Sequence, residues 1–105
     1  MSQASVERRL RQTTTRLREA REALVVLDQQ LVSLAEDADD LRVRSLVGES
    51  PMVDKEHRDA QRSFEAMSRS RAATVAEIAK LERTVDELLE RFVPSGPLPA
   101  TPDPC

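Results

Sequence analysis

The stretch Val47-Gly48-Glu49-Ser50-Pro51 decides the fold, because no other glycine or proline interrupts the chain between residues 6 and 93. Gly48 suits the left-handed position that ends many helices. Ser50 suits an N-cap, and Pro51 suits the first residue of a new helix. The chain therefore reads as two long uninterrupted segments joined by a tight turn.

The composition agrees with long helices and with a single domain. The 105 residues contain no Trp or Tyr, two Phe and two Gly, and 33% are charged, which argues against a barrel, a sandwich or a doubly wound sheet. We predict a helical hairpin over residues 1–93, with a helix over about 4–47, a turn at 48–51 and a second helix over about 52–93. The other five prolines lie beyond it, so we expect a disordered Pro-rich tail at 94–105.

Apolar residues recur at alternating spacings of three and four in both segments, which is the heptad pattern of a coiled coil. The predicted seam positions of the first helix are Val6, Leu10, Thr13, Leu17, Ala20, Leu24, Leu27, Leu31, Leu34, Ala38, Leu41 and Ser45. Those of the second helix are Val53, His57, Ala60, Phe64, Met67, Arg71, Thr74, Ile78, Leu81, Val85, Leu88 and Phe92. The pattern predicts an all-α fold, an antiparallel two-helix coiled coil.

The register of the two seams supports the hairpin. Residues that share a layer of an antiparallel pair must be centred on the turn. Two such pairs are Leu17 with Leu81 and Leu34 with Phe64. Both pairs are centred on Glu49, which lies inside the turn assigned from glycine and proline alone.

Charges favour the same pairing, because the first helix is basic near its start and acidic later, while the second helix has the opposite order. We expect Arg42 to reach Asp54 across the seam. Arg71 is a charged residue at a seam position, and we expect its guanidinium to turn toward Asp28 or solvent. Each exposed pair is worth about 0.2–1 kcal/mol, so the charges mainly set orientation and register.

Two helices leave every core layer open on two sides, and a small hairpin seldom buries enough apolar area alone. Further apolar residues occupy heptad positions b and e, on one side of the middle of the rod. They are Val25, Val32, Ala35, Ala72, Val75 and Ala79. We interpret them as a docking or self-association face, most simply between two hairpins that form a four-helix bundle with twofold symmetry. The alternative is an ordinary scatter of small apolar residues on a helix surface.

The tip of the hairpin is a second candidate surface. Val47 and Met52 are apolar there, and Glu49 and Asp54 are acidic. In outline, this acidic tip is similar to the coiled-coil finger of transcript-cleavage factors, which enter the secondary channel of bacterial RNA polymerase. The resemblance implies a regulator that inserts its tip into a large machine.

Other function classes find little support in the residues. His57 is the only histidine and lacks the companions that a metal site or a nucleophile needs, so we expect no metal, no cofactor, no small-molecule substrate and no enzymatic activity. A net charge of −3 and two aromatic residues argue against nucleic acid. No run of about 20 apolar residues predicts a membrane span. Cys105, the only cysteine, has no partner for an internal disulfide.

We therefore expect a non-enzymatic coiled-coil protein of the cytoplasm that acts by binding protein, either itself as a homodimer or a larger assembly as a scaffold or adaptor. Arginine makes up 14 of the 16 basic residues, a bias typical of GC-rich genomes, and we expect a bacterial source. The competing hypothesis is a regulator of RNA polymerase or the ribosome that acts through the tip.

Overall fold

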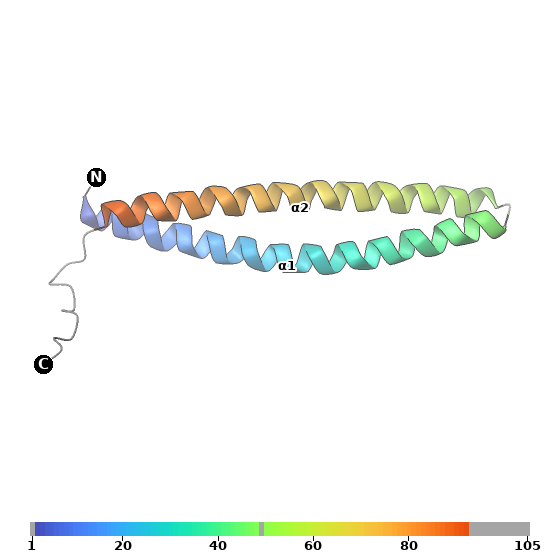
Figure 1. Ribbon diagram of the computed structural model, residues 1–105, viewed down its shortest axis with the longest axis horizontal. Coiled ribbons are helices and arrows are strands. Elements are labelled where there is room, and N and C mark those ends of the chain that lie inside the picture. The colour runs from blue at the N-terminus through green and yellow to red at the C-terminus, as the bar shows by residue number, and fades with distance from the viewer. Residues whose placement is uncertain (1, 49, 93–105) are drawn as a thin grey trace, which may run out of the picture.

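The computed structural model describes residues 2–48 and 50–92, and these form two long helices that lie side by side (Figure 1). Helix α1 spans Gln3–Val47 and helix α2 spans Pro51–Arg91. The 45 residues of α1, at 1.5 Å each, make a rod about 67 Å long. The predicted all-α helical hairpin is confirmed. The expected tail at 94–105 lies outside the described residues.

Side chains cap both helices at their starts. The Ser2 hydroxyl accepts a hydrogen bond from the Ser5 backbone N–H at 3.2 Å, and the Ser50 hydroxyl accepts one from the Val53 N–H at 3.5 Å. Pro51 takes the first position of α2, where a missing N–H costs nothing. Helix α2 therefore begins at Pro51, one residue before the start at 52 that the sequence predicted.

The prediction for Gly48 is wrong. Its φ is −125°, an extended conformation, and its N–H donates to the Arg44 carbonyl oxygen at 2.9 Å. The helical hydrogen-bond ladder thus runs up to Gly48 without a left-handed residue. Ser50, which precedes a proline, is also extended, as steric contact with the proline ring favours. Both described residues between the two helices, Gly48 and Ser50, are therefore extended.

The predicted seam is confirmed along both helices, since every residue assigned to it is buried or half-buried. Among the other described residues, only a few small or polar ones are similarly covered. They are Ser5, Ser50, Asp54, Ser68 and Thr84. The heptad pattern therefore identified the packed face of each helix.

The depth of packing changes along the rod. Within the described residues, the buried apolar side chains all lie near the open end of the hairpin, where the start of α1 meets the end of α2. They are Val6, Leu17, Leu81 and Leu88. Toward the turn, from Ala20 in α1 and from Ile78 in α2, every seam residue is only half-buried. Two helices thus form a closed core at one end and an open one over the rest of their length.

Polar seam residues satisfy their hydroxyl groups within their own helix. Thr13 is buried, and its Oγ1 donates to the Arg9 carbonyl oxygen at 2.8 Å. Thr74 donates in the same way to the Ser70 carbonyl oxygen at 3.0 Å. These bonds lower the cost of placing a hydroxyl in an apolar layer.

The conformation of Gly48 leads to a first prediction, that Gly48→Ala is tolerated or stabilising. Apart from its chain neighbours, the one described group that an added Cβ would meet is the Arg44 carbonyl oxygen, at an ordinary contact of 3.6 Å. We expect the free energy of unfolding in urea to rise by up to about 1 kcal/mol, because alanine restricts the unfolded chain. Gly48→Pro removes the N–H bonded to Arg44 and should lower it. A clear loss of stability in Gly48→Ala would contradict the extended conformation.

The closed end of the core leads to a second prediction, which compares two neighbouring leucines. Leu88 is 2% exposed and Leu89 is 52% exposed. We expect Leu88→Ala to lower the free energy of unfolding by about 2–5 kcal/mol, as removal of a packed leucine does. Leu89→Ala should change it by about 0.5 kcal/mol or less. Urea titrations followed by circular dichroism measure both. Equal losses of unfolding free energy in the two variants would contradict the burial of Leu88 in the core.

Candidate interaction surface

The six residues Val25, Val32, Ala35, Ala72, Val75 and Ala79 are here called the mid-rod flank. They occupy positions b and e of the two heptad patterns, which lie on the same side of an antiparallel pair. Residues at b and e of both helices also line one groove, described below, and Arg21 and Glu82, both at e, approach to 3.8 Å. The two helices therefore present these positions on a common surface.

The mid-rod flank is open to solvent throughout. Val25 is 58% exposed, Val32 60% and Val75 41%. The three alanines are exposed as well. Large β-branched side chains left in water forgo the burial energy that a partner would supply, about 1.5–3 kcal/mol for each side chain when fully covered.

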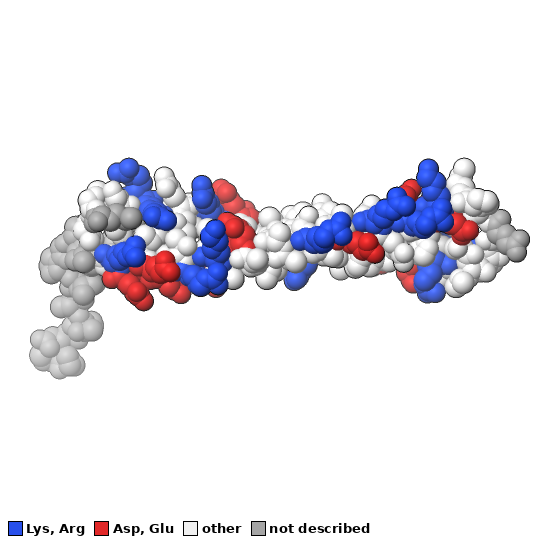
Figure 2. All heavy atoms as spheres, turned by 90° about the horizontal axis from the view of Figure 1, so that it is seen from above, with Lys and Arg blue, Asp and Glu red and all other residues white. Residues whose placement is uncertain are grey.

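The opposite flank is less apolar. Of the large apolar side chains exposed near the middle of the rod, Val26 lies on that side, against three valines on the mid-rod flank. Charged side chains gather mainly toward the two ends, and much of the middle of the rod is uncharged (Figure 2). Asp28 is the only charged residue between residues 23 and 35 of α1, so the mid-rod flank has few charged neighbours on that helix.

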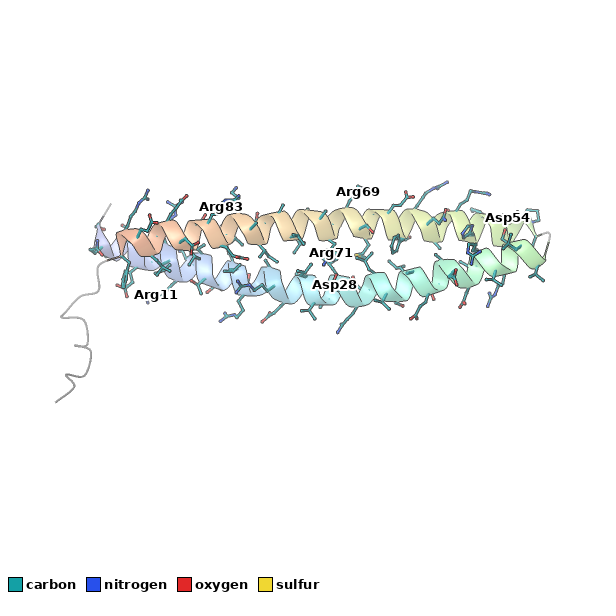
Figure 3. All side chains as sticks on the ribbon, viewed as in Figure 1. Arg11, Asp28, Asp54, Arg69, Arg71 and Arg83 are labelled. Carbon is teal, nitrogen blue, oxygen red and sulfur yellow. The ribbon has the colours of Figure 1, made fainter. Side chains whose placement is uncertain are left out.

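An ion pair crosses the seam at the centre of this surface. Arg71 and Asp28 point toward each other between the two helices (Figure 3), and the Arg71 Nε donates to Asp28 Oδ1. The hydrogen bond to Asp28, reinforced by its negative charge, raises the pKa of the Arg71 guanidinium above its ordinary value. Both side chains remain partly exposed, so the pair neutralises this part of the surface without closing it.

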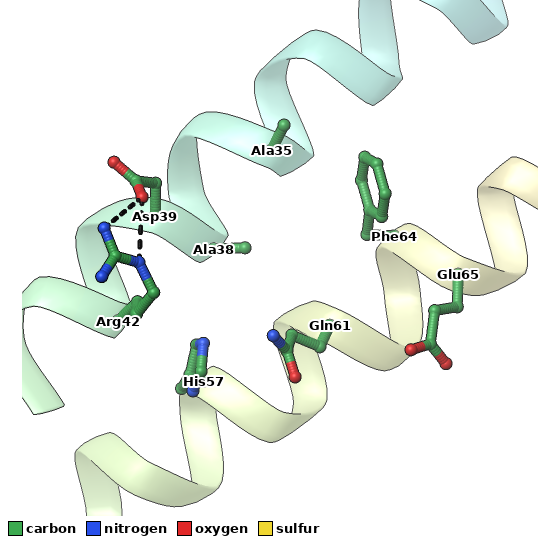
Figure 4. A pocket seen from close by; sticks show the side chains of 8 residues that line it. All are labelled: Ala35, Ala38, Asp39, Arg42, His57, Gln61, Phe64 and Glu65. Atoms are coloured by element: carbon green, nitrogen blue, oxygen red, sulfur yellow. Dashed lines mark hydrogen bonds and ion pairs between the residues drawn. The ribbon is translucent and has the colours of Figure 1, made fainter.

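A groove of about 370 Å³ continues the mid-rod flank toward the tip (Figure 4). Its floor includes Ala38, and Phe64 and His57 line it from α2. Asp39 and Arg42 stand at its edge, joined by hydrogen bonds of 2.9 and 3.2 Å. The groove exists because an alanine fills little of the space between helices. The sequence placed Ala38 in the seam but did not indicate a groove.

The expected ion pair between Arg42 and Asp54 is wrong. Arg42 pairs with Asp39, one turn earlier on its own helix, and the Asp54 carboxylate accepts a hydrogen bond from the Ser45 hydroxyl. An intrahelical partner three residues away needs less ordering of the long arginine side chain than a partner on the facing helix.

One ring nitrogen of His57, which lines the groove, is buried without a hydrogen bond to any described residue. This atom is Nε2. The side chain occupies a seam position and is half-buried, as the heptad pattern predicted. Within residues 2–48 and 50–92, no cluster of His, Cys, Asp or Glu could hold a metal ion.

Exposed apolar side chains dominate the described part of the tip. Val47 is 85% exposed and Met52 is 71% exposed, and Leu46 beside them is also exposed. Asp54 is half-buried and bonded to Ser45, and Glu49 lies outside the described residues. The described part of the tip is therefore apolar.

Neither described helix is long and apolar enough to cross a membrane. No protein family model matches the chain, and no curated protein or solved structure is significantly similar to it.

A third prediction concerns the unpaired atom of His57. We expect His57→Leu to raise the free energy of unfolding by about 1 kcal/mol, because leucine removes a buried nitrogen without a partner and adds apolar contact. Lys55→Leu, an exposed residue two positions earlier, serves as the control and should change it by about 0.5 kcal/mol or less. Urea unfolding measures both, and a destabilised His57→Leu would show that Nε2 has a bonding partner in solution.

Proposed function

We propose that the protein is a non-enzymatic coiled-coil adaptor or scaffold of the cytoplasm, which binds protein partners through the mid-rod flank. The observation that carries this proposal is the open core: half-buried seam residues lie beneath exposed valines over the same length of rod. A partner on this side would cover both the flank and the unfinished layers below it.

The shape of the surface favours a helix as the element that docks. The flank follows two straight helices, and its alanines at 35, 72 and 79 have small side chains that let another backbone approach. Helices pack at axis separations of about 8–10 Å when small side chains alternate with larger ones at the contact. Val25, Val32 and Val75 would supply the larger side chains.

The hairpin tip is the second candidate, and its apolar exposure favours it. Leu46, Val47 and Met52 are the most exposed of the large apolar side chains in the described residues. A stiff rod that ends in such side chains can place them in a cleft of a large assembly such as RNA polymerase or the ribosome. In that case the tip, and not the mid-rod flank, would carry the function.

Substitutions on the two flanks give a fourth prediction. The double variant Val25→Glu, Val75→Glu places carboxylates on the mid-rod flank, and we expect it to weaken partner binding about tenfold or more, since each charge would be buried without a counterion. The matched control is Val26→Glu, Ala73→Glu, which adds the same charges at neighbouring positions on the opposite flank. Affinity capture from the cytosol, with quantitative mass spectrometry, compares both variants with the unaltered chain.

Circular dichroism keeps this comparison interpretable, because both variants must keep the helicity of the unaltered chain. If the glutamate pair unfolds the rod, Val25→Ser, Val75→Ser is used in its place. Equal capture by the two variants would refute the mid-rod flank. A variant with Glu49→Lys and Met52→Lys that alone loses the captured proteins would support the tip.

A further inference from the structure

We propose that the partner of the mid-rod flank is a second copy of this chain, which lies antiparallel so that the open end of each rod lies beside the tip of the other. This inference rests on the proposed function and names the partner and its register. A twofold axis passes through the flank near Asp28 and Ala72, so that α1 packs on the partner's α1 and α2 on the partner's α2.

The apolar residues of α1 are self-complementary under this rotation. With the axis midway between Val25 and Val32, each of these valines faces the other valine of the partner. Both side chains are more than half exposed in the single hairpin. The symmetry repeats the contact on the other side of the axis, so four exposed valines become covered together.

Charged residues on either side of the two valines are also paired by this twofold axis. Arg18 and Asp39 are centred on the same point of α1 as the two valines, so Arg18 faces the partner's Asp39. Both hydrogen bonds from Arg42 go to Asp39 Oδ1, which leaves Oδ2 to accept from the partner's Arg18. Opposite charges therefore meet at both ends of the apolar contact.

The residues of α2 give a separate estimate of where the twofold axis crosses the rod. Arg58 and Asp86 lie at equal distances along α2 on either side of Ala72, so the rotation that puts Ala72 on the axis also pairs Arg58 with the partner's Asp86. Within one hairpin, Arg71 is hydrogen-bonded to Asp28. In the seam register Ala72 lies level with Val26 of α1, so this centre lies within one helical turn of the centre found from α1.

The ion pair at that level makes the close approach possible. Two Asp28 carboxylates meet near the axis, where unpaired like charges would repel each other. Each one already carries the guanidinium of its own Arg71, whose pKa it raises. The centre of the interface is thus neutral before the second copy arrives.

A parallel arrangement of the two rods fits less well. It would place Val32 against the partner's Glu65 and Val75 against the partner's Arg21. In the antiparallel arrangement Val32 meets a valine and Val75 meets the partner's Ser68. The antiparallel arrangement therefore keeps carboxylates and guanidinium groups away from the exposed valines.

Disulfide trapping tests the register in the full chain, with Cys105→Ser to remove the native thiol. Ala72→Cys lies on the axis and should form a covalent dimer on mild oxidation, because the two sulfurs meet there. Ala73→Cys, the next residue and on the opposite flank, is the matched control and should remain monomeric on a non-reducing gel. Val25→Cys and Val32→Cys should each stay unlinked alone and should link when mixed.

Several results would overturn the proposal. Light scattering that gives a monomer mass at tens of micromolar would refute self-association. So would equal trapping of Ala72→Cys and Ala73→Cys. Linkage of Val25→Cys to Ala72→Cys, without linkage of Ala72→Cys to itself, would refute the antiparallel arrangement in favour of the parallel one.

The capture experiment separates this inference from the proposed function. A monomeric chain whose other captured proteins are lost only in Val25→Glu, Val75→Glu would refute the second copy and leave the mid-rod flank as a docking surface. A dimer that the same variant converts to monomer, while Val26→Glu, Ala73→Glu stays dimeric, supports both.

Discussion

Every layer of this rod depends on a single contact, the apolar seam between two antiparallel helices, and such a seam covers its residues from one direction only. A leucine on one helix is faced by its partner on the other, while its sides remain open to water. At the open end of the hairpin the seam nonetheless closes, around Val6, Leu17, Leu81 and Leu88. Nearer the turn it does not, and Leu24, Leu27, Leu31 and Leu34 remain half-buried. The open part of the seam is the part that lies beneath the exposed valines of the mid-rod flank.

Most polar residues in the seam have hydrogen-bond partners, which lowers the cost of placing them between the helices. Thr13 and Thr74 bond to carbonyl oxygens of their own helices, and Arg71 extends out of the seam to Asp28. An arginine in a seam penalises shifted pairings more than it strengthens the correct one, because only one register brings it beside its carboxylate. His57 is the exception, with a buried nitrogen that has no partner among the described residues.

Much of the fold could be predicted from spacing. The heptad pattern identified every covered seam position, and the pairing centre at Glu49 placed the turn. The errors concern single side chains and local backbone. The sequence predicted a left-handed Gly48 at the end of α1, but Gly48 is extended. Helix α2 begins as predicted from the Ser50 N-cap and Pro51. Arg42 was assigned to Asp54 because the two are close across the seam, yet Asp39 on its own helix is the nearer partner.

The candidate surface could be predicted only in part. Positions b and e indicated which residues share a side of the rod, because heptad position alone determines the direction of a side chain on a helix. Exposure is different, since it depends on how deeply the two helices interpenetrate at each level, and this is a property of the packed pair.

The sequence by itself determined the helices, their antiparallel register and the composition of each flank, because these follow from periodicity and from where glycine and proline occur. The tertiary structure alone decided where the core closes, the groove beside Ala38 and Phe64, and the hydrogen bond that Asp54 accepts from Ser45. These features depend on the local distance between the two helices and on which polar groups come closest to one another. Heptad periodicity does not specify either of them.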